Sequence, residues 1–283
     1  MNPLRVSADA TAIRSGAIAP VVASLPVSLT NAGTDTPASE LVAVDGALGW
    51  PQRTRDALGN GTQGLMLIQP CPVTADEVPQ TPSVPVVVDY RFAGNPAVLT
   101  FAGHFDGWPV EALVEVSSLV SDQGDLHRHL LDQLATARRL GLPLTDLQPL
   151  AWGPSGYYLR GSTGLGVPVL LSAHVTSAAP ACLRVRGLAP DLAIELSVPD
   201  PSTARPAVLV TTTSGGALTE PTVWESAHRA AWRRLHAAAV GALPVTDLDD
   251  LRADLTVANH VLPPPDNRPS KALHETSPRK DPS

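Results

Sequence analysis

The stretch Gly64-Leu-Met-Leu-Ile-Gln-Pro70 is a continuous apolar run that stops at a proline. A second run of the same kind, Val84-Pro-Val-Val-Val-Asp89, stops at an aspartate. Unbroken apolar runs of this length are typical of strands buried on both faces, as in a parallel sheet covered by helices on each side. Shorter apolar runs at 4–6, 27–29 and 41–44 predict further strands of the same sheet. The segments 51–58 and 74–78 are long enough only for small connecting helices.

The middle of the chain predicts a transition from this sheet to a second unit. Residues 95–105 are expected to form a short helix with Pro96 in its first turn, where the missing amide proton costs nothing. Residues 110–120 alternate in a way that predicts a strand. Leu126, Leu130 and Leu134 recur at helical spacing, and Gly141 follows the last turn, so a helix is expected over 125–140.

The sequence changes in character after residue 147. Strand-like runs at 156–160, 167–177, 182–185, 192–198 and 207–213 are separated by turn residues. Helices are expected at 221–241 and from Thr246 to about Leu262, the second with a capping box of Thr246 and Asp249. The predicted fold class is therefore α/β plus α+β: a small Rossmann-like parallel-sheet domain at 1–92, then an open antiparallel-sheet domain with helices on one face at 93–262. Residues 263–283 are a polar, Pro-rich tail that we expect to be disordered.

Composition excludes several classes of protein. The chain carries 20 Lys+Arg against 27 Asp+Glu, a formal charge of −7, which argues against a nucleic-acid binder. No apolar run approaches the ~20 residues that cross a bilayer. Two isolated cysteines and an N-terminal apolar stretch broken by Pro20 and Pro26 predict a cytoplasmic protein without a signal peptide. The only lysines, Lys271 and Lys280, lie in the tail, so no Schiff-base or P-loop lysine is expected in the folded part.

One glycine motif matches a dinucleotide fingerprint in letters but not in context. Gly59-Asn-Gly-Thr-Gln-Gly64 has the pattern G-x-G-x-x-G, which binds a diphosphate only when it follows a strand and opens a helix. Here it follows a predicted helix and precedes a strand, so we expect a connecting loop. After the first strand, where the fingerprint belongs, only Gly16 is present.

The densest polar constellation lies on the predicted helix 125–140. Asp125 and His129 are four residues apart and share a helix face, and Asp132 follows His129 by three. A carboxylate beside an imidazole orients the ring and stabilises its charged form, as a base that takes a hydroxyl proton requires. The alternative is structural: Asp125 caps the helix, and His127 and His129 are solvated.

The order of these motifs resembles the glucose–fructose oxidoreductase/inositol dehydrogenase/MocA (Gfo/Idh/MocA) family, as a trimmed and divergent member. The resemblance implies a Rossmann domain for NAD or NADP and a second domain built on an open antiparallel sheet. It implies that Asp125 and His129 act on a substrate hydroxyl and that Pro70 lines the nicotinamide side. Residues 86–91 are similar to the strand that ends in the family's Glu-Lys-Pro step. Asp89 is thereby implied in cofactor binding, and Tyr90 stands where the family has its lysine.

Three functional hypotheses follow. The first is an NAD(P)-dependent oxidoreductase acting on a hydroxyl of a sugar, polyol or related small molecule, with His129, Asp125 and Tyr90 as catalytic residues and Pro70 and Asp89 at the cofactor. The second is a catalytically degenerate relative that binds a small molecule or a protein partner. The third is a structural protein that dimerises through its open sheet. All three predict no nucleic acid, no membrane and no metal, and the sheet offers a surface for a homodimer.

Overall fold

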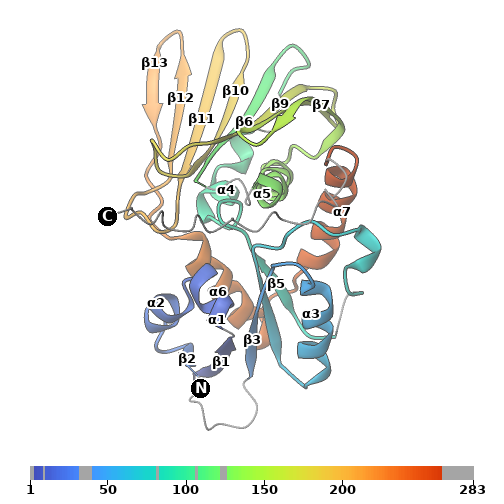
Figure 1. The fold of residues 1–283 in the computed structure, drawn as a ribbon. Helices are drawn as coiled ribbons and strands as arrows, with labels where there is room; N and C mark the ends of the chain where they lie inside the picture. The colour runs from blue at the N-terminus through green and yellow to red at the C-terminus, as the bar shows by residue number, and fades with distance from the viewer. Residues whose placement is uncertain are drawn as a thin grey trace, which may run out of the picture.

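The computed structural model describes residues 3–8, 10–31, 40–80, 83–105, 108–121 and 126–262. They form a five-stranded sheet and an eight-stranded sheet, with helices between and beside them (Figure 1). The predicted fold class is confirmed in this two-sheet arrangement. The tail 263–283, for which disorder was expected, lies outside the described residues.

The smaller sheet is entirely parallel, with the strand order β2-β1-β3-β4-β5. Its strands are β1 (Leu4–Ala8), β2 (Leu29–Asn31), β3 (Leu41–Asp45), β4 (Gly64–Ile68) and β5 (Val86–Asp89). Every residue of β4 and β5 is buried, which is why both read as continuous apolar runs in the sequence. The strand expected at 27–29 begins later, at Leu29, and Val27 is 83% exposed in the preceding turn.

Helices cover both faces of this sheet (Figure 1). On one face lie α1 (Ala10–Ser15), α2 (Ile18–Ala23) and α6 (Ala227–Ala239), and Trp232 and Leu235 of α6 pack with Met66 and Val87. On the other face lie α3 (Trp50–Gly59) and α7 (Asp247–Asn259), with the 3₁₀ turn η1 (Ala75–Glu77) beside α7. The C-terminal helices therefore return to the N-terminal sheet. The domain division at residue 92 stays a prediction.

The larger sheet has the order β13-β12-β11-β10-β6-β9-β8-β7. Its strands are β6 (Leu113–Val120), β7 (Leu144–Gly153), β8 (Gly156–Thr163), β9 (Pro168–Val175), β10 (Cys182–Leu188), β11 (Leu192–Pro199), β12 (Val208–Thr213) and β13 (Gly216–Thr219). All neighbours are antiparallel except β6 and β9, which run parallel, so the sheet is mixed. The helix α5 (Leu126–Arg139) packs on one face of it, as expected.

Short segments connect the two sheets. After β5 the chain forms α4 (Pro96–Thr100) and η2 (Ala102–Phe105), and Asn95 caps α4 by accepting a hydrogen bond from the Ala97 amide at 2.9 Å. The capping box expected at Thr246 is wrong: the Thr246 side chain does not cap α7, and its hydroxyl instead lies 3.2 Å from the Asp250 carboxylate. The helix expected from residue 221 begins at Ala227, after the N-cap Ser226.

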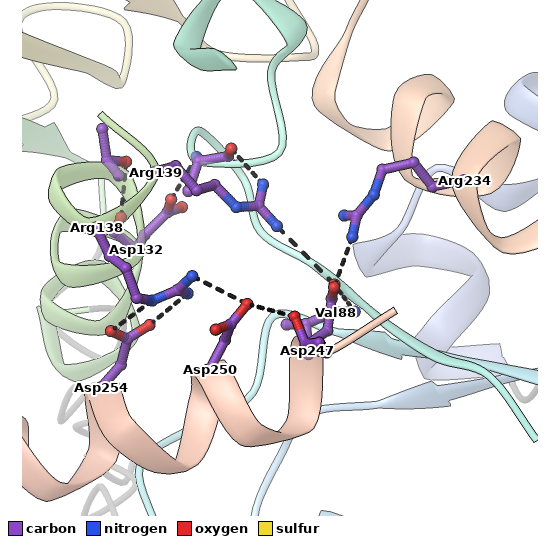
Figure 2. Close-up of polar contacts among 11 residues, drawn as sticks. Val88, Asp132, Arg138, Arg139, Arg234, Asp247, Asp250 and Asp254 are labelled. Atoms are coloured by element: carbon purple, nitrogen blue, oxygen red, sulfur yellow. Dashed lines mark hydrogen bonds and ion pairs between the residues drawn. The ribbon is translucent and has the colours of Figure 1, made fainter. Parts of the chain in front are cut away.

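A buried network of charges joins α5, α6, α7 and β5 (Figure 2). Asp247 accepts hydrogen bonds from the Val88 amide at 2.9 Å and from Arg234 at 2.5 Å. Arg138 binds both carboxylate oxygens of Asp254, at 3.2 and 2.9 Å. Because α5 packs on the larger sheet and α7 on the smaller one, this network fixes the two sheets relative to each other at the edge where β5 ends.

Candidate functional site

Strands β4 and β5 end side by side, facing the first turn of α5. Ligands of parallel α/β sheets bind beyond the carboxyl ends of the strands. A small hollow of ≈ 10 Å³ lies here, lined by Gln69, Pro70, Tyr90, Arg91, Arg128, His129 and Asp132. This volume holds about one water molecule. Four of the residues singled out in the sequence, Pro70, Tyr90, His129 and Asp132, thus meet at one place, whereas Asp125 lies outside the described residues.

His129 is almost fully buried, and its Nδ1 atom has no hydrogen-bond partner. Its ring lies against Phe92, with the ring centres 5.6 Å apart. Burial, which disfavours the charged imidazolium, and to a lesser extent the Arg91 guanidinium together lower the pKa of His129 to about 3. His129 is therefore a neutral imidazole at physiological pH. His129 is therefore not solvated, contrary to the structural alternative.

Asp132 holds the chain that leaves β5. Its carboxylate accepts hydrogen bonds from the backbone amides of Phe92 at 2.9 Å and Ala93 at 2.6 Å. Burial raises the pKa of Asp132 to about 6, although these two hydrogen bonds lower it in part. The contacts give Asp132 a positioning role: it fixes the loop that carries Tyr90 and Arg91 past His129.

Tyr90 points toward the interface of α5 and α7. The Arg139 guanidinium lies over its ring, 5.6 Å from the ring centre. The hydroxyl is buried without a hydrogen-bond partner. Burial raises the pKa of Tyr90 well above its usual range, and the Asp254 carboxylate of α7 adds to the effect. A catalytic role for Tyr90 stays a prediction.

Asp89 makes a contact that the sequence did not reveal. One of its carboxylate oxygens lies 2.7 Å from Nδ1 of His228, in the first turn of α6, and the other, Oδ1, is buried without a partner. Asp89 is wholly buried and His228 is 7% exposed. Burial by itself would lower the pKa of His228, but the Asp89 carboxylate raises it above the ordinary value. The cofactor-binding role of Asp89 stays a prediction.

An ion pair lies close to both histidines. Arg91 donates through Nε to the Asp200 carboxylate at 2.7 Å, and Asp200 follows directly after β11. The charges of Arg91 and Asp200 act on the pKa of His129 and also on that of His228. The pair therefore contributes a guanidinium and a carboxylate to the electrostatic surroundings of both imidazoles.

Gln69 is a site residue that sequence reasoning missed. It has a positive φ of 44°, which is uncommon for a residue other than glycine and marks a constrained position. Its side chain donates to the Ser15 carbonyl at 3.2 Å, and its backbone amide donates to the Asp89 carbonyl at 2.9 Å. The only signal in the sequence was its place between a buried strand and Pro70.

The edge where a dinucleotide would bind carries few groups suited to a diphosphate. Arg53 donates to the carbonyls of Asp45, Ala47 and Leu48, which closes the loop after β3. Between β1 and Gly16 the sequence has no glycine to let a diphosphate approach the backbone. The motif 59–64 joins α3 to β4 and is the connecting loop that its context predicted. Within the described residues, no group of three or more His, Cys, Asp or Glu side chains is placed to hold a metal ion.

Comparison with known proteins gives a match in structure but not in sequence. No family model matches the chain, and no curated protein matches it significantly. It is similar to UDP-N-acetylglucosamine 3-dehydrogenase from Acidithiobacillus ferrooxidans, with a TM-score of 0.70 and 14% identity. It is also similar to a 3-ketoreductase from Actinomadura kijaniata in complex with NADP and TDP-benzene (0.68 and 15%) and to an oxidoreductase from Sinorhizobium meliloti (0.69 and 12%).

Each alignment covers 92% of this chain and 97% of the other. The fold implied by the Gfo/Idh/MocA resemblance, with its small parallel sheet and its larger sheet, is thus confirmed over nearly the whole molecule. The low identities are in keeping with a divergent sequence on this fold.

Proposed function

We propose, from the fold that this chain shares with sugar dehydrogenases and ketoreductases, that it is an NAD(P)-dependent oxidoreductase acting on a hydroxyl of a sugar, polyol or related small molecule. The observation that carries the proposal is His129: a buried, neutral imidazole with an unpaired Nδ1 in the hollow at the carboxyl edge of the parallel sheet. A buried polar atom without a partner costs stability, which is the cost expected at a site that receives a ligand.

The fit of the cofactor differs between its two ends. At the reacting end, Pro70 and His129 both line the hollow, Nδ1 of His129 has no partner, and the resemblance assigns Pro70 and Asp89 to the cofactor. At the diphosphate end the loop after β1 lacks the glycine cradle, and we assign no residue there. When bound, the nicotinamide would supply the acceptor or donor of a hydride.

The residues of this chain would prepare the hydroxyl for that reaction. His129 is placed to hydrogen-bond the hydroxyl through Nδ1, and burial keeps the imidazole neutral. Asp132 holds the loop that positions Arg91 beside it. Entry of a sugar requires the hollow to widen, because it now has room for about one water. The predicted base role of His129 and its orientation by Asp125 remain part of the proposal.

Titration of NADH and NADPH tests the proposal, with binding followed by cofactor fluorescence. A saturable change is expected, and none up to millimolar cofactor would overturn the enzymatic function. Where binding occurs, His129→Ala should abolish turnover and leave cofactor affinity within about twofold of the wild type. Unchanged turnover would remove His129 from the reaction.

The second candidate is a catalytically degenerate relative that binds a small molecule or a protein partner. It is favoured by one observation: Arg53 and Gln69 hydrogen-bond to backbone carbonyls at the edge where a dinucleotide would lie. The same titration separates the two candidates. If the relative is degenerate, neither nucleotide will bind.

We also propose a homodimer that forms through the open face of the larger sheet, opposite α5. Register places Arg160, Leu170, Glu115 and Arg186 in one row across neighbouring strands of this face. Leu170 is 40% exposed in that row, and Arg186 pairs with Glu115 at 2.9 Å. Sedimentation velocity should show a dimer, and a monomer at high concentration would contradict this assembly.

Among the described residues, none of the helices has the length and apolar character that a membrane span requires. We propose that the protein works in the cytoplasm.

A further inference from the structure

The hollow at the carboxyl edge of the parallel sheet is lined by more cationic than anionic side chains. Arg91 and Arg128 contribute guanidinium groups, and the one carboxylate among the lining residues belongs to Asp132. That carboxylate is buried and already accepts hydrogen bonds from two backbone amides. Arg128 lies in the first turn of α5, where the helix dipole adds positive potential. These charges would attract a negatively charged ligand group.

Arg91 and the unpaired histidine of the hollow contact the same aromatic ring. The Arg91 guanidinium lies over Phe92, 5.8 Å from the ring centre, and the ring centres of His129 and Phe92 are 5.6 Å apart. Arg91 and His129 both line the same water-sized hollow, so one small molecule that enters it can contact both. A hydroxyl at Nδ1 of His129 would then place other groups of the same molecule beside the guanidinium.

Arg91 is held by a carboxylate that uses one oxygen only. Nε of Arg91 donates to Oδ2 of Asp200 at 2.7 Å, and Nη2 pairs with the same oxygen. The other oxygen of Asp200, Oδ1, accepts the Ser202 amide at 2.8 Å. A carboxylate or phosphate on a ligand has two oxygens for the bidentate geometry that makes guanidinium pairs strong. Such a group can therefore pair with Arg91 more completely than Asp200 does.

The pair of Arg91 and Asp200 also spans the space between the two sheets. Arg91 follows β5 of the smaller sheet, and Asp200 follows β11 of the larger one. The Arg91 side chain is 22% exposed, so solvent and solutes reach it. If Arg91 left Asp200, one of the contacts that close the hollow would be lost, and Asp200 would keep its hydrogen bond from Ser202. Exchange of partners at Arg91 is thus a way for the hollow to widen.

We propose that this site takes an anionic sugar, one that carries a carboxylate or a phosphate, and that Arg91 binds the anionic group in place of Asp200. The inference rests on the proposed function, whose substrate class it names. It involves an exchange of ion pairs and no covalent step. Asp200 holds Arg91 while the site is empty and competes with the ligand for it.

Calorimetric titration with three related sugars tests the substrate class. Glucose, glucuronate and glucose 6-phosphate are added at one fixed salt concentration, since salt screens such pairs, to the protein alone and to the protein with NADPH. We expect at least one of the two anions to bind about tenfold more tightly than glucose, and the tighter one identifies the group as carboxylate or phosphate. Equal binding of glucose, or no binding of either anion up to tens of millimolar under both conditions, would overturn the inference.

Variants of the two partners should change the affinity in opposite directions. Arg91→Gln should weaken binding of the preferred anion about tenfold. Asp200→Asn removes the competing charge and should tighten it about threefold. Arg229→Gln is the matched control, because Arg229 pairs with Glu225 at 2.7 Å outside the residues that line the hollow, and it should leave the affinity unchanged.

A purely structural role for the ion pair would weaken anion binding in both partner variants, and that result would overturn the inference. Unchanged binding in Arg91→Gln would overturn it as well. Thermal unfolding shows whether each variant is folded. Where Arg91→Gln is not, the comparison of the three sugars and Asp200→Asn carry the test.

The inference and the proposed function fail on different results. A preference for an anionic sugar without binding of either nucleotide would overturn the proposed function and leave the anion site standing. Nucleotide binding without such a preference would do the reverse.

Discussion

Two clusters of buried charge flank β5, and they differ in how completely they are paired. In the network of Figure 2, both carboxylate oxygens of Asp247 and both of Asp254 accept hydrogen bonds. In the site cluster, Oδ1 of Asp89 and Nδ1 of His129 have no partner. A fully satisfied network contributes to holding a structure together, whereas unpaired buried atoms mark positions left for a ligand. The difference separates the part of the molecule that fixes the two sheets from the part suited to chemistry.

The largest expected effect is a loss of stability when the fully paired network of Figure 2 is broken. Asp247→Ala removes the acceptor of the Val88 amide and of Arg234, and leaves the amide buried without a partner and the half-buried guanidinium without its anion. We expect a loss of about 3–5 kcal/mol in the free energy of unfolding, measured in urea. Asp249→Asn is the control on the same helix, because its pair with Arg252 is half exposed and should change stability by less than about 0.5 kcal/mol. Equal losses in the two variants would contradict the structural role of the network.

The second effect concerns the backbone that shapes the site. A Cβ on Gly46 would meet the Ile68 carbonyl at 2.3 Å and the Pro70 Cα at 2.4 Å. Gly46→Ala should therefore cost about 3 kcal/mol in thermal or urea unfolding, since the backbone itself must move. Gly59→Ala, at the end of α3 with nothing within 4 Å, should be neutral or slightly stabilising. A tolerated Gly46→Ala would show that this edge is looser than its contacts indicate.

The third effect is a loss of stability at acidic pH, where the buried His129 becomes protonated. Its pKa falls from an ordinary 6.5 to about 3 on folding, so the unfolded chain takes up the proton first and stability drops as the pH falls below 6.5. Over the interval from pH 6.5 to pH 5 this amounts to about 2 kcal/mol. In His129→Gln that part of the pH dependence should disappear, as unfolding curves at several pH values would reveal. An unchanged slope would place His129 in water.

The smallest effect has the opposite sign and comes from His228. Its pKa is raised in the folded protein, so its stabilisation is fully present below the unfolded value of about 6.5 and is lost as the pH rises through the folded value. His228→Gln should therefore cost about 1 kcal/mol at pH 6 and less at pH 8. The same unfolding series measures it. A cost that grows with pH would contradict the pairing with Asp89.

Much of the fold was predictable because local patterns specify it. The runs at 64–70 and 84–89 became β4 and β5, and the leucine spacing of 126–134 became α5. The edge strands β7 and β13 were missed. β7 is largely exposed, contains Pro149 and has a positive φ at Asp146, so it lacks the alternation by which a strand is recognised. Pairing with β8 gives it its strand conformation.

The candidate site was predictable only in part, and the reason is sequence distance. Pro70 and Tyr90 were found through the family resemblance, and His129 was found through its spacing on the predicted helix 125–140. His228 lies 139 residues from Asp89, and Asp200 lies 109 residues from Arg91, so no spacing could relate them. Gln69 gave no sign of its positive φ.

The sequence by itself determined which segments are buried strands, which helix carries the histidines, and that the folded part has no lysine. These follow from hydrophobic period and composition, which act over a few residues. Only the tertiary structure decided that α6 returns to β5 and brings His228 to Asp89. It also decided that His129 is buried beside Arg91, where its charged form is disfavoured. Burial and neighbouring charge set proton affinity, and both depend on parts of the chain that are far apart in sequence.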